Sequence, residues 1–397
     1  MRISSSQMYA TGVSNMLDQQ AKLVKTQSQL ATGQNRLSPS DDPVGAVRSL
    51  ELTRAQEKTE QYDRNGTLLD SRLRLEESVV SSSIDVLQRV RELSIQANNA
   101  TQSNESRQSI AAELRQQLDN LVAYANTTDS SGNYIFSGYQ EGGAPISKTA
   151  SGYVYNGDDG QRQIQVGPAR SLPDGDPGSE VFMNILNGNG QFQTAINPAN
   201  TGGGVIDAGS VTDLSQFNRE SFTIRFTSES QYDVLDAGGA VVSSAAYQDG
   251  GDILAGGMAV KIKGPVAAGD EFNIAPAQRQ DVFSMVEALA VSLETPRNSP
   301  SGRALQNSEI NTAISNLDQA MDHLINKQAT IGSRLQSLER QTDLNAGASL
   351  QISTSLSLVN DLDYAEAVSR FSQQQASLQA AQQAFSKVQG LSLFNYI

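Results

Sequence analysis

The chain has 397 residues, enough for two or three domains that each bury a core of their own. Its formal net charge of −14 argues against nucleic acid or an anionic membrane as a partner, because both would repel it. Cysteine and tryptophan are absent, which excludes disulfides and thiolate chemistry and disfavours an aromatic ligand pocket. We find neither a membrane-spanning apolar run nor a cleavable signal peptide, so export would use another route.

The first predicted helix carries an apolar residue at every seventh position, at Tyr9, Met16, Leu23, Leu30 and Leu37. This spacing keeps side chains on one face only where helices wind around each other, so it predicts a coiled coil. Glutamines between these residues leave the helix marginally stable alone. Two prolines between residues 37 and 45 predict a break, with Ser40, Asp41 or Asp42 capping the next helix.

Two more helices are predicted before residue 140. The apolar face of the first consists of Val80, Leu87, Val90 and Ala97. The apolar face of the second consists of Ile110, Leu114, Leu118 and Leu121. Residues 98–104 form the turn between them. On the first of these helices, Arg89, Arg91 and Glu92 predict a solvated face with local ion pairs.

Residues 141–280 differ in composition from both flanks. They contain 22 of the 32 glycines, 7 of the 11 prolines and 16 acidic residues against 8 basic ones. Short β-like runs occur at 152–155, 162–166, 221–227, 259–263 and 271–274. We predict a small antiparallel β domain here, with a hairpin turn at Gly157–Gly160.

The C-terminal flank returns to helical spacing. A long helix between Pro300 and Thr342 has an apolar face made of Ile310, Ile314, Leu317, Met321, Leu324, Ile331, Leu335 and Leu338. Gly347 is the expected end of this helix. A terminal helix follows, again with a seven-residue spacing, at Tyr364, Phe371, Leu378 and Phe385.

Because helices lie on both sides of the insert, the flanks must close together. The predicted fold class is mainly α with a β insert: a long antiparallel helical bundle with coiled-coil terminal helices and a small antiparallel β domain projecting from one end. The predicted domains are 1–37 with 349–397, then 38–140 with 281–348, then 141–280. We call the two rows of apolar residues at seven-residue spacing, one in each terminal helix, the terminal seams. They either pair with each other in an ordinary bundle or become ordered when neighbouring copies or partners cover them.

Signatures of catalysis are missing. The only histidine, His323, lies beside an apolar stripe and reads as a structural or surface residue. The motifs G-x-S-x-G, S-x-x-K, Walker A and H-E-x-x-H are absent. The acidic pairs at 41–42 and 158–159 lack calcium-loop spacing, and the glycines at 188–190 and 202–204 lack a strand–turn–helix setting. We predict a protein that is not an enzyme and has no catalytic, cofactor-binding or metal-binding residues.

Five stretches carry a family resemblance. The run from Leu87 to Thr101, LQRVRELSIQANNAT, resembles the signature stretch of the bacterial flagellin superfamily. Three further stretches resemble its hook-filament junction branch: Met1–Ser5, Gly132–Gly138 and Leu391–Ile397. The segment from Leu37 to Pro43 also fits that branch. The resemblance covers about 1–140 and 280–397, whereas the insert is of a kind that varies between relatives.

The resemblance implies a structural subunit that joins the flagellar hook region to the flagellin filament. Such a subunit assembles as a ring after type III export without signal cleavage, and lies outside the cell between hook and filament. Its terminal helices form an inner tube, its bundle an outer tube, and its insert faces solvent. The implied partners are other copies of itself, hook-associated protein 1 on the hook side, flagellin on the filament side, and an export chaperone at the C-terminal helix.

The expected subunit-interface residues follow from the seams and from the matching motif. The seam residues would each contribute on the order of 1.5–3 kcal/mol if fully covered; they are Met16, Leu23, Leu30, Leu37, Tyr364, Phe371, Leu378 and Phe385. The motif adds Arg89, Arg91 and Glu92 as contacts with neighbouring subunits. Two other functions stay open at this point: a filament-forming flagellin with the same frame, and a surface adhesin or glycan-binding domain on a helical stalk.

Overall fold

The structure is a computed structural model that describes residues 5–99, 101–140 and 142–390. Residues 1–4 and 391–397, which belong to two of the stretches that carry the family resemblance, lie outside these ranges. The chain forms two compact units, one made of its two ends (1–64 and 341–397) and one made of residues 65–340. We call them the terminal unit and the central unit. The predicted fold class, a mainly α protein with an antiparallel β insert, is confirmed.

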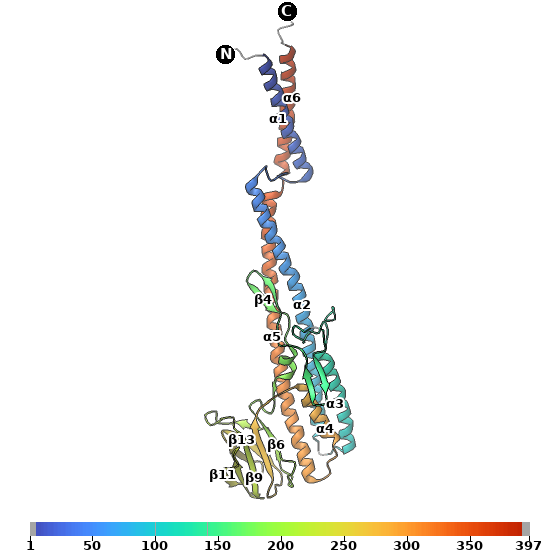
Figure 1. Cartoon of the computed structure of the whole chain (residues 1–397), viewed down its shortest axis with the longest axis vertical. Helices are drawn as coiled ribbons and strands as arrows, with labels where there is room; N and C mark the ends of the chain where they lie inside the picture. Colours follow the sequence, from blue (N-terminus) through green and yellow to red (C-terminus); the bar gives the residue numbers. More distant parts are fainter. Residues whose placement is uncertain (1–4, 100, 141, 391–397) are drawn as a thin grey trace, which may run out of the picture. The chain divides into compact units, whose positions relative to one another are not determined.

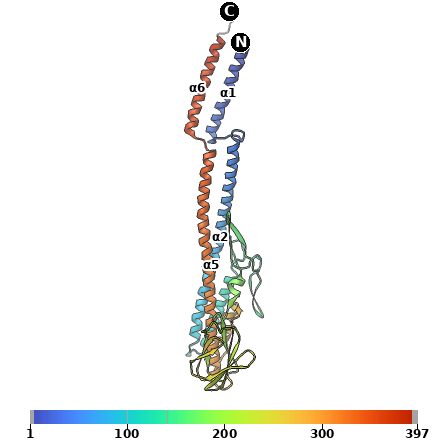
Figure 2. The same cartoon turned by 90° about the vertical axis from the view of Figure 1, so that its left-hand side faces the viewer.

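The terminal unit is built from helices alone. Helix α1 (Ser5–Thr32) and helix α6 (Tyr364–Gly390) lie side by side as an antiparallel pair (Figures 1 and 2). The unit also includes the beginning of α2 (Pro43–Ala97) and the end of α5 (Pro300–Asn360). The two terminal seams therefore face each other within one chain.

Two helix ends differ from the prediction. Helix α5 continues through Gly347 to Asn360, because one glycine costs a helix only about 1 kcal/mol relative to alanine. Helix α1 ends at Thr32, since Gly33 adopts a φ of +71° and its N–H bonds to the Gln29 carbonyl at 2.8 Å. Leu37 therefore lies in the loop before α2 and not on the first helix.

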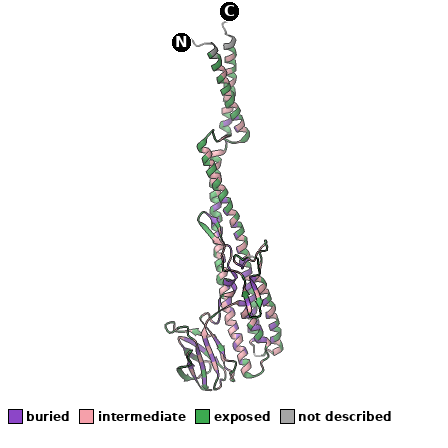
Figure 3. Cartoon of the chain, in the orientation of Figure 1, coloured by how far each residue is buried: buried purple, intermediate pink, exposed green. Residues whose placement is uncertain are grey.

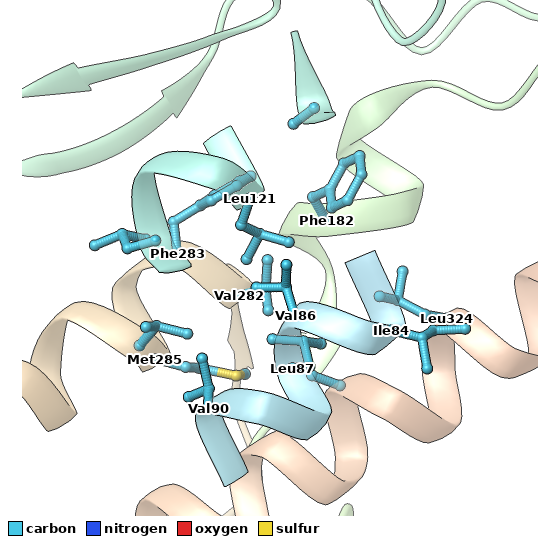
Figure 4. Close-up of a cluster of buried hydrophobic side chains, with 14 of the residues drawn as sticks. Ile84, Val86, Leu87, Val90, Leu121, Phe182, Val282, Phe283, Met285 and Leu324 are labelled. Atoms are coloured by element: carbon cyan, nitrogen blue, oxygen red, sulfur yellow. The ribbon is translucent and has the colours of Figure 1, made fainter. Parts of the chain in front are cut away.

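The central unit contains a helical bundle made of α2, α3 (Asn104–Ala125), α4 (Val282–Glu294) and α5. Figure 4 shows part of its core, with labelled side chains from α2, α3, α4, α5 and the insert. The predicted apolar faces on α2 and α3 are buried, and these helices end and begin around residues 98–103 as expected. Helix α4 was not predicted; the Asp281 carboxylate caps it by accepting the Ser284 N–H at 2.6 Å.

The first part of the insert belongs to the core of the helical bundle. Its strands pair as two hairpins, β1 (Ile146–Thr149) with β2 (Gly152–Tyr155) and β3 (Gln163–Gly167) with β4 (Arg170–Pro173). A short π-helix, η1 (Ser179–Met183), follows them. The ring of Phe182 on η1 lies 5.1 Å from Phe136 and 5.8 Å from Phe283, centroid to centroid. The insert is therefore not a single separate domain.

The second part of the insert has a core of its own, formed between two antiparallel sheets. The five-stranded sheet has the order β11 (Val241–Ala246), β10 (Gln231–Leu235), β9 (Phe222–Ser228), β14 (Glu271–Pro276), β6 (Phe192–Ile196). The other sheet comprises β12 (Asp252–Ala255), β13 (Met258–Lys263), β7 (Val205–Ile206) and β8 (Ser210–Val211). Strands β5 (Ile185–Leu186) and β15 (Arg279–Gln280) pair separately. The Gly188 N–H donates to Asn316 on α5 at 2.6 Å, which ties this part to the bundle.

The predicted hairpin turn at Gly157–Gly160 is wrong, because β2 pairs with β1 and β3 pairs with β4. The segment is instead a loop ordered around one carboxylate. Asp158 Oδ1 accepts the N–H groups of Tyr139 at 3.0 Å and of Gly160 at 2.8 Å. The local turn signal was outweighed by the contact with Tyr139, which is 19 positions away.

A buried group of charged residues joins the insert to α2 and α5. Glu76 Oε1 accepts the Asp176 N–H at 3.0 Å, and Asp176 Oδ1 accepts from Arg334 at 2.8 Å and from Gln161 at 2.7 Å. The other oxygen of each carboxylate is buried without a hydrogen-bond partner among the described residues. Burial, followed by the charge of Asp176, raises the pKa of Glu76 to about 8.

Candidate assembly site

Of the large seam residues, Tyr9 on α1 and Phe385 on α6 are in ring contact. The rings of Tyr9 and Phe385 lie 5.0 Å apart, centroid to centroid. Gly12 makes room for this contact, because a Cβ atom there would stand 3.1 Å from Phe385 Cδ2. The other large residues of the helix seams are only partly buried; they are Met16, Leu23, Leu30, Phe371 and Leu378.

The seam positions between the large residues are small or polar. Three residues on from each large residue stand Gly12, Gln19 and Thr26 on α1, and Ala367, Gln374 and Ala381 on α6, all buried or partly buried. Half of the seam therefore contributes little apolar area, so we expect the pair to be only marginally stable by itself. Figure 3 shows the consequence: the terminal helices are mostly intermediate or exposed, whereas buried residues gather in the central unit.

The segment that follows α1 and the segment that precedes α6 pair in a strand-like manner. The Asn35 N–H donates to the Asn360 carbonyl at 2.9 Å, and the Leu362 N–H donates to the Gly33 carbonyl at 2.9 Å. A Cβ atom on Gly33 would stand 2.9 Å from the Tyr364 hydroxyl oxygen, and the φ of Gly33 is positive. The connection thus requires glycine at position 33.

The acidic pair at 41–42 orders the loop before α2. Lys25 Nζ contacts Asp41 Oδ1 at 2.6 Å, and this hydrogen bond, together with the Ser38 and Leu37 N–H groups, lowers the pKa of Asp41. Asp42 Oδ1 accepts the Gly45 N–H at 2.9 Å and caps α2. The prediction that one of Ser40, Asp41 and Asp42 caps the next helix is confirmed for Asp42.

The terminal unit exposes many apolar side chains. On α1, Leu17 is 60% and Val24 51% exposed, and on α6, Tyr364 is 56% and Val368 51% exposed. Others lie on α2 and α5; they are Val44, Val47, Leu50, Leu344, Leu350 and Leu358. Exposed apolar side chains in this number make the terminal unit the candidate region for contacts with other chains.

The charged residues of the motif belong to the central unit, whereas the seam residues of α1 and α6 belong to the terminal unit. Arg89 pairs with Glu113 at 2.7 Å and with Glu92 at 3.0 Å, and Arg91 pairs with Asp318 at 2.6 Å. Of the predicted local ion pairs, Arg89–Glu92 is confirmed, whereas the other two pairs join different helices. Their partners come from α2, α3 and α5 of the same chain.

The histidine of this chain takes part in a contact between two elements of the fold. His323 Nε2 lies 2.7 Å from the Glu180 carbonyl oxygen, a contact between α5 and η1. Within 5–99, 101–140 and 142–390 we find no group of three or more acidic or histidine side chains arranged to hold a metal. None of the described helices has both the length and the hydropathy of a membrane span.

Comparison with known proteins places both flanks of the chain in one family. The model of the bacterial flagellin N-terminal helical region matches residues 3–141, and that of the C-terminal helical region matches residues 314–397. Flagellar hook-associated protein 3 of Escherichia coli K12 is 26% identical over 395 residues, which is 99% of each chain.

Solved structures agree with these matches. The crystal structure of FlgL from Xanthomonas campestris is 33% identical with a TM-score of 0.73, covering 77% of this chain and 99% of that one. The flagellar junction protein FlgL from Legionella pneumophila is 34% identical with a TM-score of 0.68, covering 73% and 99%. The chain therefore belongs to the flagellar hook-associated protein 3 (FlgL) family of the bacterial flagellin superfamily.

Proposed function

We propose that this protein is a structural, non-catalytic junction subunit of the bacterial flagellum, located outside the cell between hook and flagellin filament. The match to hook-associated protein 3 along nearly the whole chain supports this role over that of a filament-forming flagellin. The observation that carries the proposal is the terminal unit, in which both chain ends form one helix pair with exposed apolar residues. Such a pair is suited to assembly with further helices.

Assembly would produce a ring of copies through the terminal helices. Hook-associated protein 1 would lie on the hook side of this ring and flagellin on the filament side. The seam residues would hold α1 against α6, and Arg89, Arg91 and Glu92 would meet neighbouring subunits from the central unit. Exposed ion pairs of this kind contribute little stability, typically about 0–1 kcal/mol, so they can exchange partners at small cost.

Export would precede assembly and would use the flagellar type III route with the chain unfolded. Two features support this. The chain has no cysteine that could lock it by a disulfide, and the half-polar seam makes the terminal pair only marginally stable before assembly. An export chaperone would cover α6, whose Phe371, Leu378 and Phe385 otherwise face water in the unpaired chain.

Localisation tests the proposal directly. The turn between β10 and β11, Ala237–Gly239, is exposed and accepts an epitope tag without disturbing a core. Immunogold labelling of flagella with this tag should give gold only in a narrow zone between hook and filament. Gold along the whole filament would instead identify a flagellin, and absence of gold from flagella would reject a flagellar role.

Substitution of Phe385 tests the role of the seam. Phe385→Asp places a charge against Tyr9 and Gly12, so the α1–α6 pair should separate while the central unit keeps its own core. We expect no incorporation at the junction and an unchanged melting transition of the central unit. Lys387→Gln, an exposed site two residues on, is the control and should incorporate normally. Normal incorporation of Phe385→Asp would contradict the seam's role.

A further inference from the structure

Residues 174–183, which we call the latch segment, attach the insert to the helical bundle through buried contacts. The segment contains η1, whose Phe182 ring packs in the core of the bundle. The Asp176 N–H of the segment donates to Glu76 on α2 at 3.0 Å, and both of these residues are 2% exposed. The latch segment therefore combines a ring in the core with a contact between two residues that have buried carboxyl groups.

Glu76 has no basic partner in this contact. Within the described parts of the chain, no basic nitrogen lies within ion-pairing distance of its carboxylate. The basic side chains around it already pair with other carboxylates; these pairs are Arg334–Asp176 at 2.8 Å, Lys327–Glu180 at 2.8 Å and, one turn earlier on α2, Arg72–Asp174 at 3.4 Å. His323 on α5 also faces the latch segment, where its Nε2 lies 2.7 Å from the Glu180 carbonyl oxygen. An ionised Glu76 would therefore stand unpaired beside the carboxylate of Asp176.

A proton on Glu76 makes this contact favourable. One oxygen of Glu76 and one of Asp176 are buried without a hydrogen-bond partner among the described residues. Two ionised carboxylates side by side in a buried site repel each other, and a buried charge without a partner is strongly disfavoured. A protonated carboxyl group carries no charge and has an O–H donor, which a carboxylate lacks. The closed position of the latch segment is therefore suited to a neutral Glu76 and an ionised Asp176, which keeps its pair with Arg334.

We propose that the proton on Glu76 is a switch that holds the latch segment on the helical bundle. Ionised Glu76 repels Asp176, so that the latch segment separates from α2 and α5 and Phe182 leaves the core. The two-sheet part of the insert has a core of its own and stays folded when the segment opens. This inference concerns the insert and is independent of the proposed assembly function.

The size of the effect follows from the pKa of Glu76, which burial raises to about 8 in the closed position. A glutamate that faces water in the open position keeps the ordinary pKa of 4.5. Between these two values the closed state binds more protons than the open state, so each pH unit favours opening by nearly tenfold. The opening equilibrium should therefore rise about 50-fold from pH 6 to pH 8, and only about twofold from pH 8 to pH 9.

Hydrogen exchange followed by mass spectrometry measures this opening in the full chain. Peptides from the latch segment and from β9 are compared at pH 6, 7, 8 and 9, after each exchange rate is divided by the intrinsic rate at that pH. We expect the protection of the latch segment to fall about 50-fold from pH 6 to pH 8, while the protection of β9 changes far less. Glu76→Gln should abolish this pH dependence, because its neutral amide can accept the Asp176 N–H at every pH. The matched control Glu180→Gln removes a carboxylate that is 49% exposed from the same segment and should keep the pH dependence.

Three outcomes would overturn the proposal. Wild-type protection of the latch segment that does not change with pH contradicts the switch, whether or not the Glu76 variant folds. Equal loss of protection across all peptides of the central unit would make Glu76 a determinant of global stability only. The variant His323→Gln should keep the pH dependence; if the dependence disappears in this variant and persists in Glu76→Gln, the titrating group is the histidine.

Discussion

Glu76 makes the stability of the central unit depend on pH. Its side chain is 2% exposed and its nearest charged neighbours are Asp176, Arg334 and Lys327. The pKa of Glu76 is about 8 in the folded chain, against the ordinary value of 4.5. Between these two values the folded state binds more protons than the unfolded state, so the free energy of unfolding falls as pH rises. Protonated Glu76 thus contributes about 5 kcal/mol to the free energy of unfolding. This contribution is fully present below pH 4.5 and is lost by about pH 8.

The substitution Glu76→Gln removes this dependence while it preserves size. The amide oxygen of glutamine can accept the Asp176 N–H, and its NH₂ group can donate to the Asp176 oxygen that lacks a partner. We expect the variant and the wild type to be about equally stable near pH 4.5. At pH 9 the variant should be more stable by several kcal/mol, roughly the full contribution of 5 kcal/mol.

Guanidinium unfolding, followed by circular dichroism at pH 5, 7 and 9, measures the free energy of unfolding of the variant and of the wild type. Hydrogen exchange of the α2 peptide that contains Glu76 assigns the transition to the central unit. The two free energies of unfolding are subtracted at each pH, because the contributions of the other titrating groups then cancel. Glu77→Gln, one residue on and only partly buried, is the control and should change stability by less than about 0.5 kcal/mol. Parallel pH profiles for Glu76→Gln and the wild type would refute the reasoning.

Three further predictions concern the core, the terminal connection and the ion pairs. Phe182→Ala should lower the free energy of unfolding of the helical bundle by about 3–5 kcal/mol. Phe226→Ala should instead destabilise the two-sheet part of the insert first. If hydrogen exchange showed that each substitution affects both parts equally, the chain would not have two separate cores. Gly33→Ala should destabilise the terminal unit by about 1–2 kcal/mol because its φ is positive, seen as faster proteolysis between α1 and α2; unchanged cleavage would count against this. Arg91→Ala breaks an exposed pair with Asp318, so chemical denaturation should shift by less than about 1 kcal/mol, and a larger loss would mean a structural role.

Local periodicity allowed most helices to be predicted. The faces of α2, α3 and α5 and the rows on α1 and α6 depend on residues three to seven positions apart, which adjoin on any helix regardless of the rest of the fold. The terminal seams were found in this way, but only their large residues. The small and polar partners Gly12, Gln19 and Thr26 give no hydrophobic signal, and only the packed helix pair shows that they belong to the seam.

Other features depend on contacts between distant residues. Helix α4 is apolar on most sides because it is buried, so it lacks the one-sided pattern that marks a surface helix. Phe182 joins the helical core from within the insert, although the composition of the insert is that of a separate domain. Glu76 and Asp176 are a hundred residues apart, and nothing near either of them in the chain predicts that they meet.

The sequence by itself determined the helices, the β character of the insert, the absence of thiol chemistry and the family resemblance, since each depends on composition or on neighbouring residues. The tertiary structure alone decided where helices end, which part of the insert joins the bundle, and which face of α1 packs on α6. Packing decides these points because a glycine, a turn or an apolar row is compatible with several outcomes. The contacts of residues brought together from far along the chain select one of them.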